Sequence, residues 1–492
     1  MNASLHRRAF TLSALVLALA LSGCAAVPPG TQLPTLQARH DGALPAAAGR
    51  NLSPDAAGRP WWRDLRDPAL DALVAQAEAR NLDLQAALAT VREARARAGA
   101  VQAEARPQGS LGVQAQATRP ALTEVDPYRQ GLPRPPEQRL VTLGQVLSWE
   151  IDLFGRAGTA QAAAERDADA AAADARGAQA LVQAEVVSRY VALRHAQQAR
   201  QLAAEQQAVA ERRLAQLQAR ARAGLADPRE ADAATAELAQ LRAAQAGWAA
   251  QASVDWAALA VLVGESPARP GAALQALQAS APLPDVPDDA TLTVPADLLA
   301  RRPDVARADA LLRAGLGQQV LAERAYLPRL SLAATLGLQQ TTGNLGQANA
   351  LRYAAGPMLQ WDWLDSGRRA AQTAAAKAGN ERAWAQFEKT VLTALAEGET
   401  ALRGWQAQWQ AWQQAQAALQ AADQALRYTQ RREALGLEPA ATALASRQQQ
   451  LTAAQQQLDQ QARTLGAYAQ VQLALAAWQP PLSSLSPLPP SP

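Results

Sequence analysis

One unusual transition occurs twice in this chain. The stretch "WEIDLFGRAG" covers residues 149–158, and "WDWLDSGRRA" covers residues 361–370, 212 residues later. Each stretch begins with tryptophan and an acidic residue, passes through apolar residues, and reaches Gly-Arg before an alanine-rich segment. Self-similarity at a fixed spacing is the signature of an internal repeat. The chain is therefore expected to use one supersecondary unit twice.

Long segments without proline follow both motifs. Residues 158–223 and 370–434 contain no proline, and each is predicted to form one long helix. The first of these helices would be about 100 Å long at ~1.5 Å per residue. Shorter helices, each starting at or next to a proline, are predicted at residues 68–105, 228–263, 303–326 and 440–478.

The apolar residues of these helices recur with a period of seven. The clearest run consists of Leu444, Leu451, Leu458 and Leu465. Sustained heptads predict helices that wind around each other. Taken alone, this feature is equally compatible with an ordinary coiled coil.

Four short segments interrupt the helical pattern, at residues 109–117, 139–151, 329–340 and 352–364. The alternation of side chains is clearest in "RLSLAATLGLQQ" (329–340). Each segment is close to the roughly 9–11 residues that a tilted membrane strand needs. A hairpin on a soluble core would alternate in the same way, but the N-terminal signal and the long helices favour membrane strands.

The N-terminus has the pattern of a bacterial lipoprotein signal. Arg7 and Arg8 precede an apolar run at 9–21, and "LSGC" then ends in Cys24, the only cysteine of the chain. Cleavage before Cys24 would remove the signal peptide, and the new N-terminal residue would carry acyl chains. Because no aspartate follows Cys24, the pattern resembles that of lipoproteins sorted to the outer membrane of Gram-negative bacteria.

These features divide the chain into two repeats. The predicted segments are a signal peptide at 1–23, a lipidated extension at 24–60, a first repeat at 61–263, a proline-rich connector at 264–295, a second repeat at 296–478 and a proline-rich tail at 479–492.

In each repeat the tryptophan-acidic motif is expected where the chain leaves its second strand and becomes helix. The tryptophans would lie near a membrane interface, where aromatic side chains are favoured, and the glycines would permit the change from extended to helical backbone. The predicted strand-to-helix junction residues are Trp149, Gly155, Arg156, Trp361, Gly367 and Arg368.

This arrangement resembles the outer-membrane efflux proteins of the TolC/OprM type, in particular their NodT-like lipoprotein branch. The most specific stretch is "LLARRPDVARADALLRAGLGQQVLAERAYLPRLSLAATLGL" (298–338), and residues 61–91 and both motifs match too. The resemblance implies an all-α-dominated membrane channel. Three chains would each give four strands to a twelve-stranded β-barrel and continue as a long α-helical barrel in the periplasm.

The trimer also follows in part from the strand count. Four strands cannot close into a barrel, and an open sheet in lipid would leave backbone groups unsatisfied. A barrel of eight strands has an interior that side chains fill. Twelve strands, contributed by three chains, leave room for a pore.

The resemblance implies the function of an exit duct in a tripartite efflux pump, which passes small molecules such as drugs to the exterior. Its expected partners are two further copies of the chain, outer-membrane lipids, a periplasmic adaptor (membrane fusion) protein and an inner-membrane pump of the RND type. The adaptor would dock on the turns between paired helices, at Gly224, Leu225, Gly436 and Leu437.

One position departs from the family pattern. Many members have an aspartate that narrows the periplasmic mouth about two helical turns after the second turn glycine, and Ala445 stands at that place. Asp227, Glu230 or Glu438 could supply charge near the mouth, and the sequence does not choose among them.

Other functions are less well supported. A channel of a one-step protein secretion system would share the fold, whereas a periplasmic coiled-coil adaptor would also need lipoyl-like β segments. Lys+Arg total 47 and Asp+Glu 44, so no strong field favours nucleic acid. No phosphate-binding loop, nucleophile elbow or zinc-binding histidine pair occurs, which predicts no enzyme activity, catalytic residue, metal or cofactor. The two methionines do not favour metal-cation export.

Overall fold

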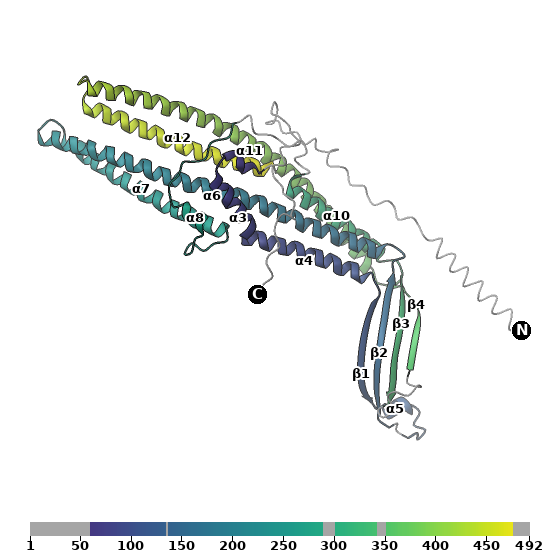
Figure 1. Ribbon diagram of the computed structural model, residues 1–492. Coiled ribbons are helices and arrows are strands. Elements are labelled where there is room, and N and C mark those ends of the chain that lie inside the picture. Colours follow the sequence, from purple (N-terminus) through teal and green to yellow (C-terminus); the bar gives the residue numbers. More distant parts are fainter. Residues whose placement is uncertain (1–59, 134–135, 289–300, 342–350, 476–492) are drawn as a thin grey trace. The chain divides into compact units, whose positions relative to one another are not determined.

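The computed structural model describes residues 60–133, 136–288, 301–341 and 351–475 (Figure 1). Cys24, the predicted signal peptide and the proline-rich tail lie outside the described residues. The helices are η3 (Trp61–Leu65), α3 (Pro68–Arg80), α4 (Leu82–Glu104), α5 (Leu122–Val125), α6 (Arg156–Arg222), α7 (Pro228–Leu262), α8 (Ala272–Ala276), α10 (Pro303–Arg324), α11 (Arg368–Ala434) and α12 (Ala440–Ala474). The strands are β1 (Gln108–Thr118), β2 (Gln138–Ile151), β3 (Arg329–Thr341) and β4 (Leu351–Gln360).

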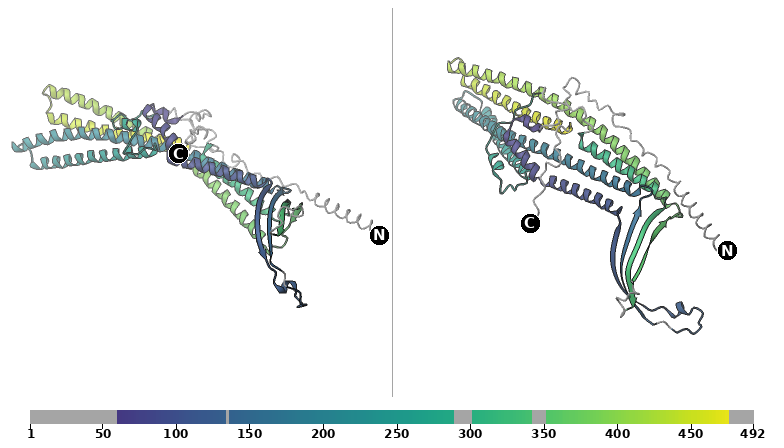
Figure 2. Two further views of the ribbon diagram at one scale, coloured as in Figure 1. Left: turned by 60° about the horizontal axis from the view of Figure 1, so that its bottom comes forward. Right: turned by 45° about the vertical axis from the view of Figure 1, so that its right-hand side comes forward.

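Two uninterrupted helices dominate the fold. Helices α6 and α11 contain 67 residues each. Helix α6 packs against α7, and α11 packs against α12, so each repeat ends in a helical hairpin. Contacts between α6 and α12 join the two hairpins, which run side by side in all three views (Figures 1 and 2).

The four strands form one antiparallel sheet in the order β1-β2-β3-β4. Strands β1 and β4 are therefore the edge strands, and each has one side that is unpaired within the described residues. Large apolar side chains are exposed on this sheet, including Leu111 (74% exposed) and Tyr353 (80%). A sheet with these properties needs both further strands and an apolar environment.

The fourth strand is shorter than predicted. Residues 352–364 were expected to be extended, but β4 ends at Gln360. The guanidinium of Arg369 donates hydrogen bonds to the backbone carbonyl and the carboxylate of Asp362. These contacts tie the segment after Gln360 to the start of α11, so it no longer follows β3.

The single helix predicted at 68–105 is wrong, because the chain breaks at Asn81. Its backbone is extended (φ −61°, ψ 128°), and Oδ1 accepts a hydrogen bond from the amide of Leu84 at 3.0 Å, which caps α4. Its Nδ2 donates to the carbonyl oxygen of Leu262, the last residue of α7, also at 3.0 Å. Asn81 thus joins the C-terminus of α7 to the N-terminus of α4.

Arg302 makes the corresponding joint in the second repeat. It is the N-cap residue of α10, and its Nη1 donates to the carbonyl oxygen of Ala474, the last residue of α12, at 2.9 Å. The same guanidinium pairs with Asp304 and with Glu397 of α11. In both joints a helix N-terminus meets a helix C-terminus, so the two helix dipoles are aligned head to tail.

The main hydrophobic core lies where η3, α3, α6, α7, α11 and α12 meet. Its largest fully buried side chains are Trp405, Tyr190 and Tyr468. Each buried hydroxyl is satisfied, because Tyr190 donates to Asp67 and Tyr468 donates to Asp64. The heptad leucines of α12 contribute Leu451, Leu458 and Leu465, which are all buried, whereas Leu444 is only half-buried.

No helix among the described residues combines the length and the hydropathy needed to cross a membrane.

We predict that Arg302→Leu lowers the free energy of unfolding by ~2 kcal/mol, because it leaves the carbonyl group of Ala474 without its hydrogen-bond partner at a joint that is largely buried from solvent. Arg313→Leu is the matched control on the same helix. That arginine pairs with Asp309 at the surface, four residues earlier, and its loss should cost no more than ~0.5 kcal/mol. Denaturant unfolding in detergent measures both, and equal effects would show that the joint adds no stability.

Candidate functional site

The two junction glycines occupy the same unusual backbone state. Gly155 (φ 66°) and Gly367 (φ 86°) are the N-cap residues of α6 and α11, and both lie in the left-handed region. This conformation turns the chain from its extended path into the helix at a single residue, and glycine adopts it without steric cost.

An aspartate before each glycine caps the helix that follows. Asp152 Oδ2 accepts a hydrogen bond from the amide of Gly158 at 3.0 Å. Asp365 accepts from the amides of Gly367 and Arg369, at 3.2 and 3.1 Å. A helix N-terminus has unsatisfied N–H groups and positive potential, so a carboxylate stabilises it in both respects. These two residues were not predicted from the sequence, although an acidic residue just before a long helix is a usable capping signal.

The two junction tryptophans make equivalent hydrogen bonds. Trp149 Nε1 donates to the carbonyl oxygen of Ala105, and Trp361 Nε1 donates to that of Tyr326, both at 3.1 Å. Each acceptor follows the helix that leads into the first strand of its repeat. The tryptophans therefore tie the end of the second strand to the start of the first. Their position at a membrane interface stays a prediction.

The arginines that follow the glycines have smaller roles than two arginines that were not predicted. Arg156 lies 3.9 Å from Glu150, and the backbone amide of Arg368 donates to the carbonyl oxygen of Asp365. Arg324 instead donates to the carbonyl oxygen of Gly155 at 2.6 Å and to Thr159 Oγ1 at 2.7 Å.

The second of these arginines is Arg369, which is buried. It contacts Asp362 and Asp365, and its guanidinium lies 5.9 Å from the ring centre of Tyr326. The double arginine in "GRRA" was a signal for Arg369. Arg324 lies 169 residues from its partner Gly155, and no local pattern indicates that contact.

The two helix turns also share one geometry. Gly224 (φ 68°) and Gly436 (φ 71°) are left-handed, and the next amide closes a six-residue ring in each turn. Leu225 donates to the carbonyl oxygen of Arg220 at 2.8 Å, and Leu437 donates to that of Arg432 at 2.9 Å. This is the Schellman motif that ends helices at glycine.

Both turns present apolar side chains to solvent. Leu225 is 69% exposed and Leu437 is 62% exposed. A Cβ atom added at Gly224 or Gly436 would meet nothing within 4 Å, so the space around both turns is open. The two turns lie at the same end of the paired hairpins (Figure 2), and the structure therefore brings the four predicted docking residues to one end.

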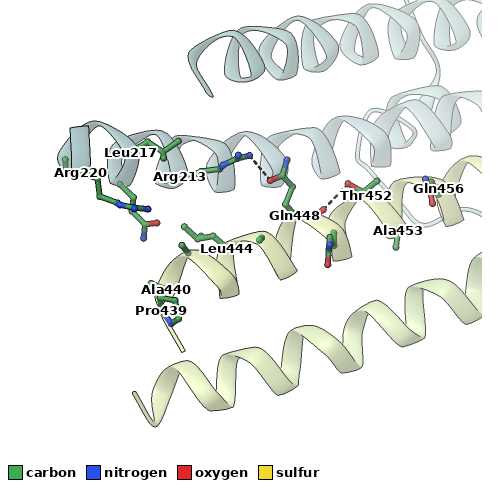
Figure 3. A pocket seen from close by; sticks show the side chains of 15 residues that line it. Arg213, Leu217, Arg220, Pro439, Ala440, Leu444, Gln448, Thr452, Ala453 and Gln456 are labelled. Carbon is green, nitrogen blue, oxygen red and sulfur yellow. Dashed lines mark hydrogen bonds between the residues drawn. The ribbon is translucent and has the colours of Figure 1, made fainter. Parts of the chain in front are cut away.

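Two of the three acidic residues considered for the mouth have local partners. Asp227 Oδ1 accepts from the amide of Arg229 and caps α7, and Glu438 pairs with Arg432 at 2.9 Å. Glu230 is exposed in the first turn of α7. Ala445 lines a groove with a volume of about 1170 Å³. The groove lies between α6 and α12 (Figure 3).

His195 is packed within the helical bundle. Its Nε2 lies 2.7 Å from Asp459 Oδ1 on α12, and its ring meets Trp248 of α7 edge to face at 5.2 Å. The described part of the chain has no group of three His, Cys, Asp or Glu arranged to hold a metal ion.

Comparison with known proteins identifies the architecture. The family described as "Outer membrane efflux protein" matches residues 73–265 and 294–477, one segment in each half of the chain. The fusaric acid resistance protein FusA of Burkholderia cepacia is 31% identical over 75% of this chain and 69% of its own. The pyoverdine export outer membrane protein OpmQ of Pseudomonas aeruginosa is 30% identical over 72% and 73%.

The solved structure of the outer-membrane channel OprN superimposes with a TM-score of 0.78, at 25% identity, over 88% of this chain and 96% of that one. This likeness confirms the predicted fold class, a helix-dominated channel in which each chain contributes a four-stranded sheet.

The substitutions Gly155→Ala and Gly367→Ala should lower the free energy of unfolding by different amounts. Both substitutions force a side chain into the left-handed region, which costs ~1 kcal/mol. The Cβ at Gly155 would also lie 3.1 Å from Arg324 Nη1, whereas nothing lies within 4 Å at Gly367. We predict that Gly155→Ala lowers the free energy of unfolding by ~2 kcal/mol and Gly367→Ala by ~1 kcal/mol.

The control is Gly158→Ala, inside the first turn of α6, which should be neutral or slightly stabilising. Denaturant unfolding in detergent gives the three values. If Gly155→Ala proves as stable as the unchanged chain, the left-handed cap does not constrain this junction.

Proposed function

Because the chain belongs to the outer membrane efflux protein family, we propose that it is the exit duct of a tripartite efflux pump, through which small molecules leave the cell. The observation that carries this proposal is the combination in one chain of an exposed four-stranded sheet and two long helical hairpins whose turns have the same geometry. The sheet suits a membrane, and the hairpins suit a long conduit that ends in a docking surface.

A homotrimer follows from the sheet. Within the described residues, strands β1 and β4 each leave one edge unpaired, which a membrane does not tolerate. Three copies would supply twelve strands, and closing them into a barrel would pair every edge and leave room for a pore.

The working partners are a periplasmic adaptor and an inner-membrane pump of the RND type. The names of FusA and OpmQ concern fusaric acid and pyoverdine. Both are small molecules, which favours drug-like or siderophore-like cargo over a one-step protein secretion system.

Anchoring by acyl chains on Cys24 is the second part of the proposal. We expect the mature protein to lack residues 1–23 and to carry lipid on Cys24, as the "LSGC" sequence indicates. Intact mass of the purified protein decides this, and a chain that keeps Met1 or an unmodified Cys24 would contradict it. Cys24→Ser should impair sorting more than folding, because the barrel holds the protein in the membrane by itself.

The turns at Gly224 and Gly436 are proposed as the adaptor-docking tips. We predict that Leu437→Asp abolishes efflux and adaptor crosslinking while the trimer mass in detergent stays unchanged, because a carboxylate at an apolar contact must be desolvated on docking. Leu437→Met, which keeps an apolar side chain, should retain both activities.

Gly436→Asp should behave like Leu437→Asp. Full resistance in either aspartate variant, with the cognate pump present, would show that the glycines only end helices. A stable monomer with a folded sheet would refute the shared barrel.

A further inference from the structure

The groove between α6 and α12 has an unusual charge composition. Of the fifteen residues that line it, the ionisable ones are Arg213 and Arg220, and no carboxylate is among them (Figure 3). A neighbouring groove between α6, α11 and α12 differs, since Glu205 and Glu433 balance its arginines. The lining of the α6–α12 groove therefore carries net positive charge, and the carboxylate at its edge is Glu237 of α7, which contacts Arg213 and Gln448.

The two arginines differ in how they are paired. Arg213 makes an ion pair with Glu237 of α7 at 3.2 Å and a hydrogen bond to Gln448, so its charge is largely compensated. Arg220 donates to the carbonyl oxygen of Leu225 at 3.3 Å and has no carboxylate partner among the described residues. One guanidinium beside the tips thus remains available to an anion.

The start of α12 adds to this potential. Pro439 is its N-cap residue and makes no side-chain cap hydrogen bond, and Pro439, Ala440 and Ala441 all line the groove. The uncapped N–H groups of a helix N-terminus carry partial positive charge. This effect supports the arginine and does not define the site alone.

The rest of the lining is apolar or neutral. Leu217 and Leu444 lie on opposite walls with several alanines, and glutamines and Thr452 supply neutral hydrogen-bonding groups. Leu444 is the heptad leucine that the hairpin packing leaves half-buried. An apolar surface beside one uncompensated cation matches a molecule with an apolar body and one negative charge.

We propose that this groove is an entry site for amphiphilic organic anions, such as aromatic carboxylates, at the tip end of the channel. The proposal rests on the efflux function proposed above and names the substrate class that the channel favours. Because a channel must also release what it binds, we expect weak binding, with a dissociation constant in the millimolar range. Such an affinity suits an open groove with one strong charged contact.

Ala445 provides a direct probe, because it is exposed within the groove and the natural chain has a single cysteine, Cys24. In the purified Ala445→Cys trimer we would compare the reaction rates of an anionic and a cationic methanethiosulfonate reagent, with the labelled peptide identified by mass. Removing one nearby charge in a watery groove changes each rate by about twofold. Arg220→Gln should therefore lower the anion-to-cation ratio about fourfold.

Arg222→Gln is the matched control, since it makes the same charge change two residues away and does not line the groove. In this variant the anion-to-cation ratio of labelling rates should change less than twofold. Millimolar 1-naphthoate should slow labelling of the thiol, and 1-naphthylmethylammonium should not. An unchanged ratio in Arg220→Gln, equal protection by both ligands, or a thiol that neither reagent reaches because a partner helix or second copy covers it would each overturn the proposal.

Cell assays separate this inference from the efflux function. With the cognate adaptor and pump, Arg220→Gln should raise susceptibility to aromatic carboxylates several-fold and leave susceptibility to cationic dyes unchanged. If both resistances persist in the variant, the groove is not selective but the channel still works. If loss of the whole chain changes neither resistance, the proposed function fails as well.

Discussion

A single chain cannot satisfy the backbone of its own sheet. Strands β1 and β4 each leave one row of amide and carbonyl groups unpaired within the described residues, and side chains such as Leu111 and Tyr353 are exposed. In an apolar medium every such group must find a partner, so the sheet is stable only when further strands complete it. Each repeat supplies a single hairpin, and joining β2 to β3 lets one chain carry both.

The second constraint is that the chain must pass from the end of a strand into a 67-residue helix within a few residues. Each junction uses the same three devices. They are a left-handed glycine, an aspartate that caps the helix, and a tryptophan that donates a hydrogen bond to the backbone just after the helix that leads into the repeat's first strand. The arginines break the symmetry between the repeats. Arg324 reaches Gly155 from the second repeat, whereas Arg369 stays within its own junction. Among the described residues, Arg324 therefore ties the first junction directly to the second repeat.

Local patterns predicted the parts of this fold that depend on local chemistry. The repeated motif, the proline-free segments and the period of seven indicated the junctions, the two long helices and the buried seam of Leu451, Leu458 and Leu465. The break at Asn81 could not be predicted in this way, because an asparagine within a helical pattern is unremarkable until Leu262 lies beside it. Arg302 is similar, since its partner carbonyl lies 172 residues away. Leu444 fits the heptad pattern, yet it lines a groove where the two hairpins leave space.

The two joints also determine where the bundle can bend. Curving α6 or α11 sharply would break successive hydrogen bonds of a continuous helical ladder, whereas the shorter helices are interrupted at Asn81 and Arg302, where a few side-chain contacts span the gap. A displacement of α7 or α12 relative to the long helices is therefore absorbed at the joints at the cost of one or two hydrogen bonds, about 1 kcal/mol each. The strand-to-helix junctions lie beyond the joints, at the other ends of α4 and α10. If the tips dock a partner as proposed, α7 and α12 can shift against α6 and α11 while the sheet keeps its register.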